Sequence, residues 1–145
     1  MSVQIELTPR AKSAVTLAVM LAAIMQMLDT TIANVALPHM QGALSATQDQ
    51  LAWVLTSYIV ASAIMTLPVG WLSGRYGRKN VFVISIAGFT LTSLLCGAAS
   101  SLNEMIAFRI LQGLFGAALV PLSQAIMLDI NPKEEHGKAM AMWAV

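Results

Sequence analysis

The stretch Gly70–Asn80, GWLSGRYGRKN, decides the fold, because it sets a cluster of cations between two long apolar runs. Three of the chain's eight basic residues, Arg75, Arg78 and Lys79, fall inside it. The flanking runs, 51–72 and 81–99, are each close in length to the ~20 residues needed to cross the hydrocarbon core of a bilayer as a helix. Since cytoplasmic loops of membrane proteins are enriched in Lys and Arg, the stretch predicts a tight cytoplasmic turn between two membrane spans.

The composition supports a membrane protein and argues against other classes. The chain is 57% hydrophobic and 10% charged, with mean hydropathy +0.73, whereas soluble domains carry about 25% charged residues. A net charge of +1 without a basic patch argues against a nucleic-acid partner. The single cysteine, Cys96, excludes a disulfide framework within the chain and any Cys-rich metal cluster. We expect no metal site, and no Ser/His/Asp grouping indicates an enzyme.

Long apolar runs divide the chain into four complete spans and the start of a fifth. They do not alternate in polarity as barrel strands would, so we expect an all-α membrane protein. Residues 1–12 are expected to form a cytoplasmic tail, and residues 13–145 a partial transmembrane domain. The predicted spans are 14–38, 51–72, 81–99, 106–130 and, incomplete, 138–145.

The basic residues indicate which loops are cytoplasmic. Arg10 and Lys12 precede the first span, and Lys133 and Lys138 follow the fourth. The loops 39–50 and 100–105 contain neither Lys nor Arg. The positive-inside rule therefore places the N-terminus and the Gly70–Asn80 turn in the cytoplasm.

Two ionisable residues, Asp29 and Arg109, lie inside predicted spans. A charge at the bilayer centre costs at least about 2.5–3.5 kcal/mol, so such residues tend to face the bundle interior and to be functional. At 1.5 Å per residue, Asp29 lies about 13 Å and Arg109 about 9 Å below the outer end of its span, so a salt bridge or a shared cavity is possible. Asn34 shares the polar face of Asp29, and Gln112 that of Arg109. Either the pair only holds the spans together, or Asp29 is a protonation site.

Small residues and a proline mark the fourth span. Gly113, Gly116 and Ala117 form a small-residue face, which permits close helix approach. Pro121 is expected to bend the helix. This set therefore predicts helix packing rather than ligand binding.

Three stretches in order resemble the major facilitator superfamily. LDTTIANVALP, residues 28–38, resembles the first-span signature of proton-coupled drug antiporters with fourteen spans. RILQGLFGAALVPLSQAIM, residues 109–127, resembles motif B of that group, and together they resemble its EmrB/QacA branch. Motif A of the superfamily is matched by Gly70, Leu72, Arg75, Gly77, Arg78 and Lys79, while Gly74 stands where the family has Asp.

The resemblance implies a bacterial inner-membrane transporter that exports varied lipophilic compounds in exchange for protons, with the proton gradient and no cofactor. Asp29, Arg109, Gln112 and Asn34 would line the proton or substrate path. The six matching motif A residues would form a cytoplasmic gate. Because Gly74 has no carboxylate, that gate would rely on its cations alone or on another acid.

The resemblance also implies partners: the lipid bilayer, small lipophilic substrates, and a periplasmic adaptor with an outer-membrane channel. Family members have twelve or fourteen spans, so the chain is expected to be an N-terminal fragment of a longer transporter. Two alternatives remain open at this point. One is a substrate-specific symporter or uniporter of the same fold, and the other is a membrane scaffold subunit that does not transport.

Overall fold

The computed structural model describes residues 8–43 and 46–144, and all regular structure in these residues is helical. The expected all-α class is therefore confirmed. Four stretches are long and apolar enough to cross a membrane, the last of them made of two consecutive helices. The elements are α1 (Pro9–Ala43), α2 (Gln48–Tyr76), α3 (Arg78–Ala98), α4 (Leu102–Gly116), α5 (Leu119–Asp129), the 3-10 turn η1 (Lys133–Glu135) and α6 (His136–Trp143).

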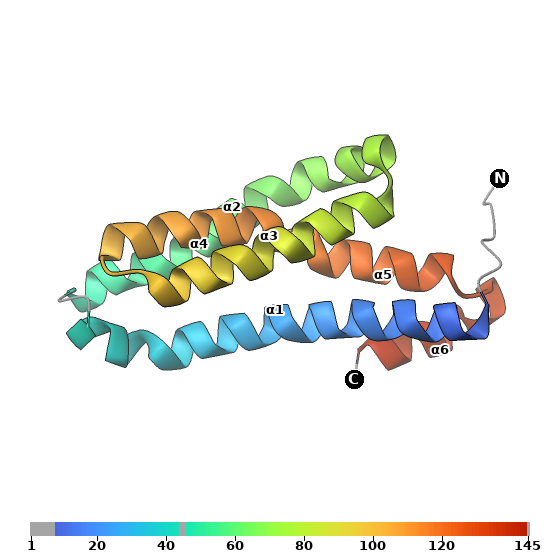
Figure 1. Ribbon diagram of the computed structural model, residues 1–145, viewed down its shortest axis with the longest axis horizontal. Coiled ribbons are helices and arrows are strands. Elements are labelled where there is room, and N and C mark those ends of the chain that lie inside the picture. Colours follow the sequence, from blue (N-terminus) through green and yellow to red (C-terminus); the bar gives the residue numbers. More distant parts are fainter. Residues whose placement is uncertain (1–7, 44–45, 145) are drawn as a thin grey trace.

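The helices form an elongated bundle in which α1 runs along the whole length of the molecule (Figure 1). The most extensive contacts join α2 to α4 and α3 to α4. α1 contacts α5 beside its N-terminal half and α2 more sparsely. The main buried cluster combines side chains from α1, α2, α3 and α5, among them Val19, Tyr58, Phe89, Leu119 and Met127.

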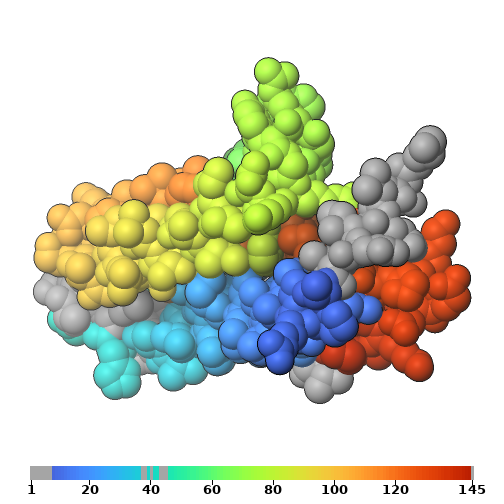
Figure 2. Space-filling model, turned by 45° about the vertical axis from the view of Figure 1, so that its right-hand side comes forward, coloured from blue at the N-terminus to red at the C-terminus, as the bar shows by residue number. Residues whose placement is uncertain are grey.

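The predicted turn at Gly70–Asn80 is much shorter in the structure. α2 continues to Tyr76 and α3 begins at Arg78, so Gly77 alone separates them. Its φ of 85° lies in a region that glycine reaches without the steric cost borne by other residues. The turn is tighter than the apolar runs predicted, because the other glycines of the stretch, Gly70 and Gly74, lie inside α2. The joined ends of α2 and α3 project from the rest of the molecule (Figure 2).

The fourth predicted span is interrupted just before Pro121. α4 ends at Gly116 and α5 begins at Leu119. Pro121 has no N–H to donate to the carbonyl of Ala117, and its ring crowds that carbonyl. The expected bend is thus a break in the helix. Pro68, by contrast, lies inside the unbroken α2.

The helix ends extend beyond the apolar runs that predicted them. α1 begins at Pro9 rather than near residue 14, so the expected tail shortens, and residues 1–7 lie outside the described residues. α2 begins after Thr47, whose hydroxyl accepts a hydrogen bond from the Gln50 backbone N–H at 3.4 Å. The Gln50 side chain accepts from the Thr47 backbone N–H at 3.0 Å, which completes a capping box. Polar ends of this kind suit helices that emerge from a bilayer.

The outer surfaces of the long helices are apolar. Met27 on α1 is 72% exposed and Leu67 on α2 is 85% exposed. Large apolar side chains on the surface suit contact with lipid or with further helices, and they do not suit water.

Candidate functional site

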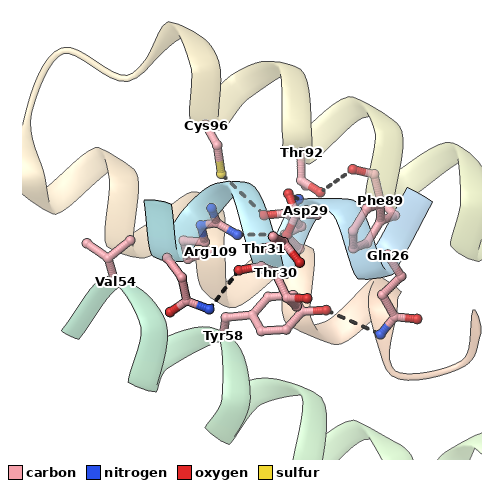
Figure 3. A network of polar contacts seen from close by, with 12 residues as sticks. Gln26, Asp29, Thr30, Thr31, Val54, Tyr58, Phe89, Thr92, Cys96 and Arg109 are labelled. Carbon is pink, nitrogen blue, oxygen red and sulfur yellow. Dashed lines mark hydrogen bonds and ion pairs between the residues drawn. The ribbon is translucent and has the colours of Figure 1, made fainter. Parts of the chain in front are cut away.

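The buried centre of the bundle is an ion pair between α1 and α4. Arg109 Nη1 donates to Asp29 Oδ2 at 2.8 Å, and Gln112 Nε2 donates to Asp29 Oδ1 at 2.8 Å. The Asp29 side chain is 13% exposed and that of Arg109 is 6% exposed. Both oxygens of the carboxylate are therefore held by donors in a site that is nearly closed to water (Figure 3).

Helical spacing explains why two donors reach one carboxylate. Arg109 and Gln112 are three residues apart on α4, so their side chains lie on the same face about one turn apart. Asp29 lies in the middle of α1, at the level of this face. The similar depths read from the sequence allowed such a pair, and the structure contains it.

Tyr58 on α2 completes the surroundings of Arg109. The guanidinium carbon of Arg109 lies 6.0 Å from the centroid of the Tyr58 ring, which is within the range of cation–π attraction. The Tyr58 hydroxyl accepts a hydrogen bond from Gln26 Nε2 at 3.3 Å. The cation is thus stabilised both by a carboxylate from α1 and by an aromatic ring from α2.

The glycines of α4 allow α2 to come this close. A Cβ atom added to Gly113 would lie 2.5 Å from the backbone oxygen of Tyr58. A Cβ atom added to Gly116 would lie 3.1 Å from the Tyr58 hydroxyl and equally close to the Phe89 ring. The neighbouring Ala117 is buried at the end of α4. The absence of side chains at the two glycines therefore determines how near Tyr58 lies to the ion pair.

Gln112 is fixed by a contact on its other side. Its side chain is completely buried, and its Oε1 accepts from the Cys96 thiol on α3 at 3.5 Å. With the oxygen facing Cys96, the amide nitrogen faces Asp29. Cys96 was expected to be only a small core residue, and the structure places it beside the ion pair (Figure 3).

Each charge of the cluster depends on the other. Two buried charges are tolerated because they neutralise each other, and a buried charge that loses its partner is strongly destabilising. Loss of the negative charge of Asp29 would leave the Arg109 guanidinium buried without an opposite charge. Two buried polar atoms in this region, Gln26 Oε1 and Arg109 Nε, have no hydrogen-bond partner among the described residues.

Asn34, predicted to share the path, occupies a different position. Its side-chain amide donates to the backbone oxygen of Thr30 at 2.9 Å. Together with Thr30 and Arg109 it lines a small cavity between α1, α2 and α4. Asn34 therefore lines the same cavity as Arg109 of the ion pair.

The cations of the motif A stretch are directed to different partners. Arg78, at the start of α3, forms an ion pair and hydrogen bond with Asp129, the last residue of α5. The Arg75 guanidinium lies over the rings of Trp71 and Tyr76, 5.6 and 5.8 Å from their centroids. Lys79 is exposed, and Gly70 and Leu72 lie on the last turns of α2. Asp129 thus supplies the motif with a carboxylate that Gly74 does not.

Sequence reasoning missed Tyr58 and Asp129. Tyr58 is a polar-tipped aromatic residue in the middle of an apolar span, and the glycines of the fourth span were a signal that a large side chain would face them. Asp129 lies at the end of the fourth span, on the side to which the basic residues of Gly70–Asn80 had been assigned. Within the described residues, no three His, Cys, Asp or Glu side chains are placed to hold a metal ion.

Comparisons with known proteins agree with the resemblance of the three motifs. Residues 19–145 match the family model described as Major Facilitator Superfamily. The chain is 45% identical over 130 residues to the "Multidrug export protein EmrB" of Haemophilus influenzae, covering 90% of this chain and 26% of that protein. The protein of the same name in Escherichia coli K12 is 43% identical over 130 residues, covering 90% of this chain and 25% of its own. The "Fatty acid resistance protein FarB" of Neisseria gonorrhoeae is 44% identical over 131 residues, covering 90% and 26%. The chain therefore spans about a quarter of the length of these relatives.

Proposed function

The chain belongs to the major facilitator superfamily, and from this we propose that it takes part in exporting lipophilic compounds in exchange for protons. It is a multi-pass membrane protein with four stretches able to span a bilayer. Two of the relatives carry the name multidrug export protein. The single observation that carries the proposal is the buried Asp29 carboxylate held by Arg109 and Gln112.

Asp29 is the proton-binding group in this proposal. When Asp29 is ionised, its charge pairs with Arg109 and draws α1 against α4. When it binds a proton, the buried cation loses its partner, and the arrangement of α1 relative to α4 becomes unfavourable. Proton binding therefore shifts the population between two arrangements of the helices, which is what coupling of protons to transport requires.

The proposed orientation has the N-terminus and the α2–α3 junction in the cytoplasm of a bacterial cell, with the chain in the inner membrane. The positions of the basic residues support this orientation. At that junction, Arg78 and Asp129 would form part of the cytoplasmic gate. A periplasmic adaptor and an outer-membrane channel remain proposed partners, on the resemblance alone, and the proton gradient is the proposed energy source.

Replacing Asp29 tests the proposal. Asp29→Asn in the complete gene product is expected to abolish proton-coupled efflux, and Asp29→Glu to retain part of it, because only Glu can still bind and release a proton. The measurement is substrate-induced proton release from energised everted membrane vesicles, followed with a pH-sensitive fluorophore. Asp49→Asn is the matched control, since Asp49 is an exposed acid in the first turn of α2. Unchanged coupling in Asp29→Asn would remove Asp29 from the mechanism.

A susceptibility profile tests the substrate class. Cells with and without the gene are exposed to lipophilic cations and to long-chain fatty acids, the latter because one relative is named a fatty acid resistance protein. Greater resistance when the gene is present, lost again on dissipating the proton gradient, supports export. Uptake in place of efflux would favour a symporter or uniporter, and no effect on any compound would favour a scaffold.

A further inference from the structure

A groove lies between α1, α5 and α6, at the end of the bundle where α1 begins. Its volume is about 460 Å³, within the range of about 300–1,000 Å³ that is usual for small-molecule sites. Figure 1 shows α6 beside the N-terminal half of α1 at this end. Neither Asp29 nor Arg109 lines the groove, so it is separate from the buried ion pair.

The lining of the groove changes from charged to apolar with depth. On α1 the lining residues run from Lys12 to Met20, and on α6 from Lys138 to Met142. Both helices run away from this end of the molecule (Figure 1), so the lysines lie at the rim and the methionines lie deeper. At 1.5 Å per residue, Met20 is about 12 Å beyond Lys12 along α1. Met127 of α5 adds a third methionine, and flexible methionines adapt to irregular apolar groups.

The rim of the groove is positively charged. Lys12 Nζ lies 3.5 Å from Glu135 Oε2, with both side chains partly open to water. Lys138 is exposed and forms no ion pair within residues 8–43 and 46–144. Two lysines therefore face one glutamate around the rim. The first turns of α1 and α6 contain no acidic residue, so the partial positive charges of both helix N-termini add to this field.

We propose that the groove binds one anionic phospholipid, with its phosphate between Lys12 and Lys138 and one acyl chain along the methionines. Basic pockets between membrane-spanning helices bind anionic lipid head groups by this chemistry. A lipophilic cation would meet like charges at the rim. A free phosphate would leave the apolar wall in water, and an apolar helix would bury lysines at a high desolvation cost.

The surface beside the groove favours a lipid with two chains. Leu17 borders the groove, and Leu21 and Ile24 follow it on the same face of α1, all three exposed. Because this surface suits contact with lipid, the second acyl chain can remain in the bilayer while the first enters the groove. The orientation given under the proposed function places this lipid in the cytoplasmic leaflet. Binding itself does not depend on that orientation.

Photo-crosslinking of the complete gene product in lipid nanodiscs tests the proposal. Phosphatidylglycerol and phosphatidylcholine, each with a diazirine in the acyl chain, are supplied in equal amounts, and labelled residues are identified by mass spectrometry. Leu94 is the matched reference, since it is exposed on α3 and does not line the groove. We expect the ratio of phosphatidylglycerol to phosphatidylcholine label to be at least about fivefold higher at Met20 and Met142 than at Leu94, as expected from even one lysine beside an anionic head group. Equal ratios would overturn the proposal. So would unlabelled methionines, which would mean that another part of the complete protein fills the groove.

Charge variants identify the groups that hold the head group. Lys12→Gln with Lys138→Gln should lower the ratio at the methionines to that of the reference. Arg10→Gln with Lys133→Gln is the control, because both are exposed at the same end and neither lines the groove. Glu135→Gln should raise the ratio by about twofold or more, since Lys12 then has no competing carboxylate. A merely structural ion pair predicts a fall in Glu135→Gln. That fall, or an equal loss in the control, would contradict the proposal.

Competing ligands distinguish the phospholipid from other anions. Unlabelled phosphatidylglycerol should displace the label, and excess inorganic phosphate should not, because phosphate alone gains nothing from the apolar wall. Displacement by phosphate, or by oleate alone, would assign the groove to a free anion or a fatty acid and overturn the proposal. Because crosslinking needs no transport, loss of efflux with the label intact would contradict only the proposed function. Efflux by a protein whose groove takes no lipid would contradict only this inference.

Discussion

Two of the ion pairs that join distant parts of the chain differ in how much water reaches them. Asp29 and Arg109 connect α1 to α4 with side chains that are 13% and 6% exposed. Arg78 and Asp129 connect α3 to α5 with side chains that are each 48% exposed. The chemistry is the same in both pairs. Breaking a buried pair is costly, because either partner alone would be an uncompensated charge. Breaking an exposed pair costs little, because water can solvate both charges.

The comparison implies different roles for the two ends of the fourth span. The pair on α4 is difficult to break without another change, such as the arrival of a proton. The pair on α5 can open and close at low cost, as a contact that changes during a conformational cycle must. The three predictions that follow test this distinction, beginning with the largest effect.

Removing Arg109 should produce the largest loss of stability. Arg109→Leu leaves the Asp29 carboxylate buried without its cation, so we expect the free energy of unfolding to fall by about 3–5 kcal/mol. Thermal unfolding of the purified protein in detergent measures the change. Combining Arg109→Leu with Asp29→Asn should recover much of the loss, because no buried charge then remains unpaired. A double variant no more stable than the single one would mean that the pair is not what makes Arg109 important.

Adding one carbon at Gly113 on α4 and at Gly74 near the end of α2 should have opposite effects on stability. Gly113→Ala places a Cβ atom 2.5 Å from the Tyr58 backbone oxygen, and overpacking of this kind costs about 1–3 kcal/mol. Gly74→Ala, in the last turn of α2, meets no atom within 4 Å and should stabilise α2 by up to about 1 kcal/mol through helix propensity. The same unfolding measurement compares them. If Gly74→Ala lowered the free energy of unfolding as much as Gly113→Ala, the close approach of α2 and α4 would not be the cause of the loss in Gly113→Ala.

Breaking the exposed pair should have the smallest effect. Arg78→Gln is expected to lower the free energy of unfolding by about 1 kcal/mol or less. The effect should shrink further between about 0.1 M and about 1 M salt, where the screening length falls from about 10 Å to about 3 Å. Lys79→Gln, next along the chain, is the control for loss of one exposed charge. An effect above that of Arg109→Leu, or one insensitive to salt, would reverse the ranking of the two pairs.

The sequence predicted the features that depend on one helix at a time. Apolar runs of sufficient length identified the helices, and the depths of Asp29 and Arg109 along their spans indicated that they could meet. Tyr58 and Asp129 were not predicted, because their importance depends on which helix faces which, and hydropathy does not contain that information. The junction at Gly77 was misjudged for a local reason: glycines at the end of α2 were interpreted as turn residues, and a single positive φ was enough.

The break between α4 and α5 has a consequence for how the protein fits membranes of different thickness. At 1.5 Å per residue, the 28-residue stretch Leu102–Asp129 is about 42 Å long and the 35-residue α1 about 52 Å. Both exceed the ~30 Å of hydrocarbon in a bilayer. The continuous α1 can adapt only by tilting or by extending beyond the lipid, whereas the interrupted stretch can also change the angle between its two segments. Such a change displaces Asp129 more readily than Arg109. A change in bilayer thickness would therefore affect the exposed Arg78–Asp129 pair before the buried pair.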